Sequence, residues 1–381
     1  MNGVALKMLF GETSKLLGLI FGMAFSTLLI CQQASMFVGL ISRTANQVSE
    51  IREPDIWIMD PTVEYADTVR PLRNTELARV RGVSGVAWAV PYFRGQAVIT
   101  TPGAPLQNSF VYGLDDVTLV GLPRDFVVGT PDDLHRPDAI AIDLPGYKKV
   151  WPNDPVAAGK VIELNDRRAV VVAVLKTLPP FQTQPLVYTR YSQALTYTNN
   201  GRNQMSYVLA KTAEGKSVES VAREIMRQTG LKAIPADDFR WATILYYLRN
   251  TGIPINFGTV VMLGAIVGIA VVGLTFNMFV MDNLKQYAAL KAMGVTNGRL
   301  MGMVTLQASV VGVVGYTLGL AVTALFFEMA TASPTSFFRG FYLPWQIALG
   351  VAGVAMTIIL LTAVFSLRRV LVVDPAVVFR G

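Results

Sequence analysis

Four long stretches of this sequence contain no Asp, Glu, Lys, Arg or His, and this feature limits the fold more than any other. The stretches are residues 16–41, 255–280, 300–327 and 345–367. A helix that crosses a bilayer needs about 20 predominantly apolar residues. Each stretch is long enough, so the sequence predicts an α-helical membrane protein with four transmembrane helices.

The spacing of these stretches divides the chain into three parts. Residues 1–41 hold an amphipathic N-terminal segment and the first transmembrane helix, and residues 255–381 hold helices two to four. Residues 42–254 between them have the composition of a globular domain. The first apolar run is longer than that of a cleaved signal peptide, so we expect it to be retained. The predicted layout is one span, a large α+β domain, and three spans.

The positions of the basic residues predict which parts face the cytoplasm. The formal net charge is +7, but no block of Lys and Arg indicates a nucleic-acid partner. Lys and Arg near the ends of spans favour the cytoplasmic side. Eight of them flank the proposed cytoplasmic ends (Lys7, Lys15, Lys285, Lys291, Arg299, Arg368, Arg369 and Arg380), against Arg339 alone in the loop after the third span. We therefore expect cytoplasmic termini and a domain at 42–254 on the outer side of the membrane.

The domain at 42–254 shows mixed helix and strand signals. We expect a strand at 55–59, a helix at 74–81, and strands at 83–93, 96–101 and 109–112 separated by Gly/Pro turns. Asn165-Asp166 predicts a hairpin. Residues 205–234 predict a β-α-β unit, and 237–249 a helix that leads into the second span. The centre, about 114–203, is rich in Pro and is a possible inserted subdomain.

The residue types that carry catalysis are scarce. Cys31 is the single cysteine and lies in the first span, and His135 is the single histidine. Residues 210–217 match a loosened P-loop pattern, but Ala210 replaces its first glycine, and Ser217 suits the cap of the next helix. We therefore expect no catalytic residue, no metal site, no bound cofactor and no enzymatic activity in this chain.

Small residues recur at a spacing of four in the predicted spans. This spacing lets transmembrane helices approach closely, which indicates a tight bundle or a homodimer. The pairs are Gly18 and Gly22, Gly264 and Gly268, and Gly315 and Gly319. Gln32, Gln33 and Ser35 place polar groups in the first span, where such groups are costly unless paired. They predict either hydrogen bonds between helices or part of a substrate path.

A short amphipathic helix is predicted between the second and third spans. Asp282 can cap a helix over 283–293, and Gly294 can end it. Leu284, Tyr287 and Leu290 give it an apolar face. So short a helix is unstable alone, so we expect that face to dock on a partner surface.

Two segments carry a resemblance to a known family. Lys285-Gln-Tyr-Ala-Ala-Leu-Lys-Ala-Met-Gly-Val-Thr296 resembles the R-E-I-[GA]-[IL]-L-[RK]-A-[LM]-G-A-[TS] segment of MacB/FtsX/LolC-type (type VII) ABC transporter permeases. Residues 374–380 resemble the D-P-A-x-[AV]-[LF]-R ending of that family. The layout of spans is also similar, and Gln32-Gln33 suggests the DevC-like branch. Gln286 departs from the pattern, because an acid is usual there.

The resemblance implies a function and a set of partners. It implies a non-catalytic subunit of a bacterial inner-membrane exporter that moves a lipophilic or amphipathic substrate by mechanotransmission. ATP and Mg would act in a separate ABC ATPase dimer. Further implied partners are a second permease copy, an HlyD-type periplasmic adaptor with an outer-membrane tunnel, and membrane lipids. The ATPase-coupling helix would present Lys285, Gln286, Tyr287, Leu290, Lys291, Met293 and Gly294.

Two alternatives to export remain. One is an FtsX-like signalling permease that regulates a periplasmic partner and transports nothing. The other is a membrane-anchored enzyme, which would need a reactive constellation that the sequence does not offer.

Overall fold

The structure is a computed structural model that describes residues 2–103, 105–198 and 204–372. The chain forms two compact units. The membrane unit comprises Met1–Gly39, Gly252–Ala330 and Phe341–Gly381, and the α+β domain comprises Leu40–Thr251 and Thr331–Gly340. The loop 331–340 therefore belongs to the α+β domain, whereas the sequence indicated only a connection between two spans.

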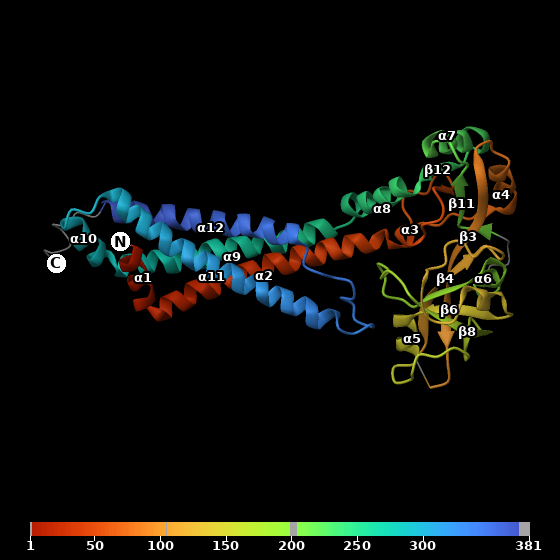
Figure 1. The fold of residues 1–381 in the computed structure, drawn as a ribbon, viewed down its shortest axis with the longest axis horizontal. Helices are drawn as coiled ribbons and strands as arrows, with labels where there is room; N and C mark the ends of the chain where they lie inside the picture. Colours follow the sequence, from red (N-terminus) through yellow and green to blue (C-terminus); the bar gives the residue numbers. More distant parts are fainter. Residues whose placement is uncertain (1, 104, 199–203, 373–381) are drawn as a thin grey trace. The chain divides into compact units, whose positions relative to one another are not determined.

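The described chain has four helices that are long and apolar enough to cross a membrane (Figure 1). They include all four uncharged stretches, so the predicted spans and their one-plus-three order are confirmed. The helices are α2 (Thr13–Thr44), α9 (Ile253–Asp282), α11 (Asn297–Thr331) and α12 (Trp345–Val372). Two shorter helices complete the membrane unit, α1 (Asn2–Gly11) and α10 (Leu284–Ala292).

The α+β domain is built on one mixed sheet of ten strands (Figure 1). The strand order is β12-β1-β11-β3-β4-β9-β6-β8-β5, and β7 pairs with β3 and β8. The small β2–β10 ladder lies apart from it. The strands are β1 (Ile56–Met59), β2 (Leu72–Arg73), β3 (Val86–Thr100), β4 (Gln107–Leu114), β5 (Asp125–Val128), β6 (Ala139–Asp143), β7 (Lys160–Leu164), β8 (Arg167–Lys176), β9 (Leu186–Arg190), β10 (Gln204–Met205), β11 (Tyr207–Thr212) and β12 (Lys232–Pro235).

Helices in the domain follow local sequence signals. Ser217 caps α7, and Gly230 ends it with a left-handed φ of 71°. The predicted helix at 74–81 is confirmed as α4. The helices are α3 (Asn46–Glu50), α4 (Asn74–Arg81), α5 (Leu144–Val150), α6 (Tyr191–Tyr197), α7 (Val218–Thr229) and α8 (Ala236–Asn250), with a 3-10 turn, η1, at Pro131–His135.

β3 corrects one prediction. The sequence predicted two strands, 83–93 and 96–101, separated at Arg94-Gly95, but the structure has one continuous strand, Val86–Thr100. Pro91 is paired opposite Val208 of β11. A Cβ on Gly95 would lie 2.7 Å from both the Phe93 ring and Thr198. Gly95 therefore permits close packing within a strand and does not mark a turn.

The predicted hairpin and β-α-β unit are both present. Asn165 and Asp166 connect β7 to β8, with φ values of 47° and 64°, as a two-residue turn with left-handed residues requires. β11, α7 and β12 follow each other in the chain, but β1 lies between the two strands and pairs antiparallel with both. The β-α-β unit is therefore split by the first strand of the domain.

Candidate functional site

The α9–α10 junction and α10 itself are the segment that the sequence marks for coupling. α9 continues through Asp282, so Asn283 and not Asp282 stands at the start of α10. The buried Asn283 side chain donates from Nδ2 to Glu12 Oε1 at 2.8 Å and to the Phe279 carbonyl at 2.9 Å. Gly294 follows the helix with a φ of 86°, the left-handed conformation that glycine accepts without steric cost.

The apolar face of α10 packs on the chain's own bundle. Tyr287 is 1% exposed, and its hydroxyl donates to Gln307 Oε1 of α11 at 2.8 Å. Gln307 Nε2 donates in turn to the Ala5 carbonyl of α1 at 2.9 Å. Leu290 packs against the same apolar core. The sequence analysis expected this face to dock on a partner. In the structure it fixes α10 to α11 and α1 instead.

The opposite side of α10 is open. Lys285 and Gln286 are exposed, Met293 is 72% exposed, and Lys291 is half-buried. An exposed methionine at one end of the helix and polar side chains at the other offer a partner both apolar and polar contacts. With Gly294, which is also exposed, these are the residues assigned to coupling that a partner can reach.

Lys15 connects the start of α2 to the end of α9. Its ammonium group pairs with Glu12 Oε2 at 2.5 Å and with the Asp282 carboxylate. With the Asn283–Glu12 hydrogen bond, this polar cluster joins the N-terminal segment to the α9–α10 junction. A displacement of α10 therefore acts on α1, α2 and α11 together, through contacts within the membrane unit.

Five of the six glycines predicted to pack helices lie at close approaches within one chain, and Gly18 is in ordinary van der Waals contact. A Cβ on Gly22 would lie 2.7 Å from Val271 of α9, and one on Gly315 would lie 2.5 Å from Met23 of α2. Gly18 faces Thr275, Gly264 faces Ile30, Gly268 faces Ser26, and Gly319 faces Ala24 and Thr27. These contacts form a bundle inside a single copy.

The polar residues of the first span lie on α2. Ser35 is 1% exposed, and its hydroxyl has no hydrogen-bond partner among the described residues. Gln32 and Gln33 are half-buried. Their assignment to a substrate path stays a prediction. The 374–380 ending falls outside the described residues.

The loosened P-loop pattern and the single histidine, both in the α+β domain, lie in turns and at a helix cap. Ser217 Oγ accepts from the Ser220 backbone at 3.2 Å as the cap of α7, and Lys216 is exposed beside Gly215 in a turn. His135 is exposed in η1. Among the described residues, no group of three or more His, Cys, Asp or Glu is placed to hold a metal ion.

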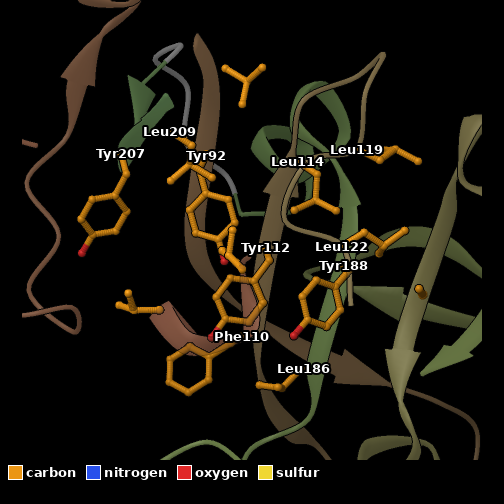
Figure 2. Packing of buried hydrophobic residues seen from close by; sticks show 14 of the residues in the cluster. Tyr92, Phe110, Tyr112, Leu114, Leu119, Leu122, Leu186, Tyr188, Tyr207 and Leu209 are labelled. Carbon is orange, nitrogen blue, oxygen red and sulfur yellow. The ribbon is translucent and has the colours of Figure 1, made fainter. Parts of the chain in front are cut away.

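A row of tyrosines that the sequence analysis missed crosses the sheet. Figure 2 shows Tyr207, Tyr92, Tyr112 and Tyr188 on adjacent strands, with their hydroxyl oxygens pointing the same way. Ring centres are 6.0 Å apart for Tyr92 and Tyr112, and 5.1 Å apart for Tyr112 and Tyr188. Trp57 of β1 meets Tyr207 edge-on at 5.2 Å.

These rings are fully buried, and burial raises the pKa of the Tyr92, Tyr112 and Tyr188 hydroxyls above their ordinary value. Tyr92, Tyr112 and Tyr188 stack in turn across β3, β4 and β9, and the Tyr207 ring of β11 meets Tyr92 at a tilt of 38°. These tyrosines occupy matching positions on strands that are distant in the chain. No local pattern in the sequence therefore reveals the row.

Two family matches cover the chain. Residues 16–228 match the MacB-like periplasmic core domain. Residues 258–375 match the FtsX-like permease C-terminal region. The chain is an ABC transporter permease of the MacB/FtsX type. The resemblance seen in residues 285–296 is thereby confirmed at the level of the family, and so is the fold class.

The chain is also similar to individual proteins. The permease is 26% identical over 317 residues to an uncharacterized ABC transporter permease of Mycobacterium tuberculosis strain H37Rv, covering 82% of this chain and 80% of the relative. It is 20% identical over 234 residues to one from Methanocaldococcus jannaschii, covering 59% and 58%. The solved periplasmic region of MacB from Actinobacillus actinomycetemcomitans aligns with 54% of this chain and 96% of its own, at 15% identity and a TM-score of 0.38.

Proposed function

We propose that this permease couples ATP hydrolysis in a separate ABC ATPase dimer to movement of its α+β domain, and so exports a lipophilic or amphipathic substrate. The observation that supports this is the state of α10. Its apolar side is anchored to α11 and α1 through Tyr287 and Gln307, while Lys285, Gln286 and Met293 remain exposed. A short helix that is fixed on one side and exposed on the other is suited to transmit a displacement from a partner to the helix bundle.

The proposal includes a location and partners. It places the permease in the bacterial inner membrane with both termini and α10 in the cytoplasm and the α+β domain in the periplasm. It joins two permease copies to the ATPase dimer, which binds the ATP and Mg. A periplasmic adaptor of the HlyD type, with its outer-membrane tunnel, would carry the substrate onward.

The contact at Met293 provides the test. Burying a methionine at an interface is worth roughly 1.5–3 kcal/mol, so Met293→Asp should weaken ATPase binding by about tenfold or more. The assay is co-purification of the ATPase from membranes, with mass-spectrometric comparison of lipids and lipopeptides in the medium. Val4→Asp is the matched control, because Val4 is an exposed apolar residue of α1 at 44% exposure.

Three results separate the possibilities. The coupling proposal predicts loss of the ATPase and of the exported material in Met293→Asp and neither loss in Val4→Asp. Normal co-purification and export in Met293→Asp would exclude α10 as the coupling element. Retained ATPase coupling with no difference in released lipids between wild-type and deletion strains would favour the signalling alternative.

A further inference from the structure

The loop between α11 and α12 is part of the α+β domain. Residues 331–340 cluster with Leu40–Thr251, although the helices on both sides of the loop belong to the membrane unit. The chain therefore passes between the two units at four places: 39–40, 251–252, 330–331 and 340–341. The connections at 39–40 and 251–252 are the two ends of the domain. Those at 330–331 and 340–341 are the two ends of the loop that joins α11 to α12.

Arg43 holds the backbone of this loop. One guanidinium nitrogen of Arg43 donates to the carbonyl oxygens of Phe337, at 2.8 Å, and of Arg339. The guanidinium group also lies 5.3 Å from the centre of the Phe337 ring. Arg43 is 3% exposed, so these contacts are shielded from water. Because the acceptors are backbone carbonyls, these hydrogen bonds of Arg43 depend on the backbone conformation of the loop.

Arg339 adds an electrostatic attraction from the loop toward the domain. Its guanidinium is attracted to the carboxylates of Asp143 and Glu50 on the domain, and burial lowers its pKa from the ordinary value. Asp143 is 1% exposed. Arg339 also shares a pocket lining with Pro334 and Thr335 of the loop and with Asp143. The charge that this half-buried arginine brings is therefore balanced by the domain and not by its own loop.

Gly340 completes the attachment. Its φ of 78° is left-handed, and a Cβ at this position would lie 3.2 Å from Pro179 of the domain. Asn46 Nδ2 donates to the Pro179 carbonyl at 2.7 Å, which fixes that proline. The last residue of the loop thus turns in close contact with a segment that is itself held by α3.

We propose that the 331–340 loop is a third mechanical attachment of the α+β domain, through which the α11–α12 hairpin drives the domain, with Arg43 and Arg339 as the positioning residues. The proposal rests on the function proposed above. A body held at two points can rotate about the line that joins them, and a third attachment removes that rotation. A domain held only at its two ends would lose part of any imposed motion to such rotation.

The test uses the full permease with the ATPase that co-purifies with it, in lipid nanodiscs and in a Cys31→Ser background. Docking is read from the rate at which a membrane-impermeant maleimide labels Ser336→Cys, a half-buried position of the loop. Motion is read from spin labels at Glu163→Cys and Asn297→Cys, one in each unit, as the change in their distance on adding ATP, Mg and vanadate. The variants are Arg43→Gln and Arg339→Gln, and the control is Arg124→Gln, an exposed arginine paired with Glu53.

We expect the variants to keep ATP turnover and to lose the ATP-dependent movement of the domain. Loss of hydrogen bonds from a charged group should speed labelling at 336 by about tenfold in Arg43→Gln. ATP turnover should stay at the wild-type rate in both variants, while the ATP-dependent distance change is largely lost. A residue needed only for folding would lower turnover and distance change together. Arg124→Gln should match the wild type in every readout.

Two results would overturn the proposal. Unchanged labelling in both variants would show that the loop is not docked through these arginines. Faster labelling with a full ATP-dependent distance change would show that a docked loop carries no motion. A wild-type complex without any ATP-dependent change would overturn the coupling function itself, and the labelling rates would still report separately whether the loop is docked.

Discussion

Asp143 is a carboxyl group held where ionisation is unfavourable. It is buried at the end of β6 and accepts from the backbone of Leu186 at 2.8 Å and of Gly146 at 3.2 Å. Burial raises the pKa of the Asp143 carboxyl from 3.8 to about 6, against the opposing effect of the Leu186 donor and of Arg339. The folded state therefore holds a proton at Asp143 at pH values where the unfolded chain has released it.

This shift predicts how stability depends on pH. The contribution of the protonated carboxyl is complete below about pH 4 and is lost as pH rises through about 6, at a cost of up to about 3 kcal/mol. Asp143→Asn keeps an acceptor for both backbone donors and cannot ionise. We expect the variant to unfold at higher urea than the wild type at pH 8, by tryptophan fluorescence, and at similar urea at pH 4.

An exposed carboxyl gives the comparison. Asp132→Asn in η1 alters a solvated aspartate and should leave the pH dependence of the urea midpoint as in the wild type. A midpoint for Asp143→Asn below that of the wild type at pH 8 would show that ionised Asp143 stabilises the domain, contrary to the effect of its burial.

At the scale of elements, the contact between α11 and α2 depends on the absence of a side chain at Gly319. A Cβ at this position would lie 2.5 Å from the Ala24 carbonyl oxygen and 2.7 Å from Thr27 Cβ. Backbone atoms cannot move aside as a side chain can, so Gly319→Val should separate the helices and destabilise the bundle by roughly 1–3 kcal/mol. Thermal unfolding in detergent measures the effect.

Gly353 on α12 is the matched control, because a Cβ there meets nothing within 4 Å. Gly353→Val should leave the unfolding temperature close to that of the wild type. Equal losses at the two positions would indicate that valine lowers stability through helix propensity and not through the α2 contact.

The elements that could be predicted from the sequence are those set by local rules. The Asn165-Asp166 turn and the capping of α7 by Ser217 depend on neighbouring residues alone. Gly95 was misread as a turn signal because Thr198, against which it packs closely, lies far away in the chain.

The candidate site was predictable to the same extent. The sequence located α10, its amphipathic pattern and the glycine that ends it. It could not show which surface receives the apolar face. The Tyr287–Gln307–Ala5 chain of hydrogen bonds joins three segments that no periodicity connects. The tyrosine row across the sheet was hidden for the same reason.

At the scale of the whole molecule, the distribution of Lys and Arg predicts the topology. A cysteine introduced at Glu214, next to Gly215, in a Cys31→Ser background, should react with a membrane-impermeant thiol reagent in intact spheroplasts. A cysteine at Asn297 should react only after the membrane is permeabilised. Both positions are exposed in their own units, so burial does not explain a difference. The reverse pattern of labelling would invert the orientation and contradict the proposed position of α10.

The place of β1 between β11 and β12 sets an order of events during biosynthesis. β1 is the first strand of the domain to leave the ribosome, yet both of its partners lie after residue 206. Pairing over such a separation is slow, and unpaired strands in the meantime are exposed to aggregation. The domain therefore cannot close its sheet until synthesis has passed β11. Its first apolar strand stays without a strand partner for as long as the roughly 150 residues between β1 and β11 are being made.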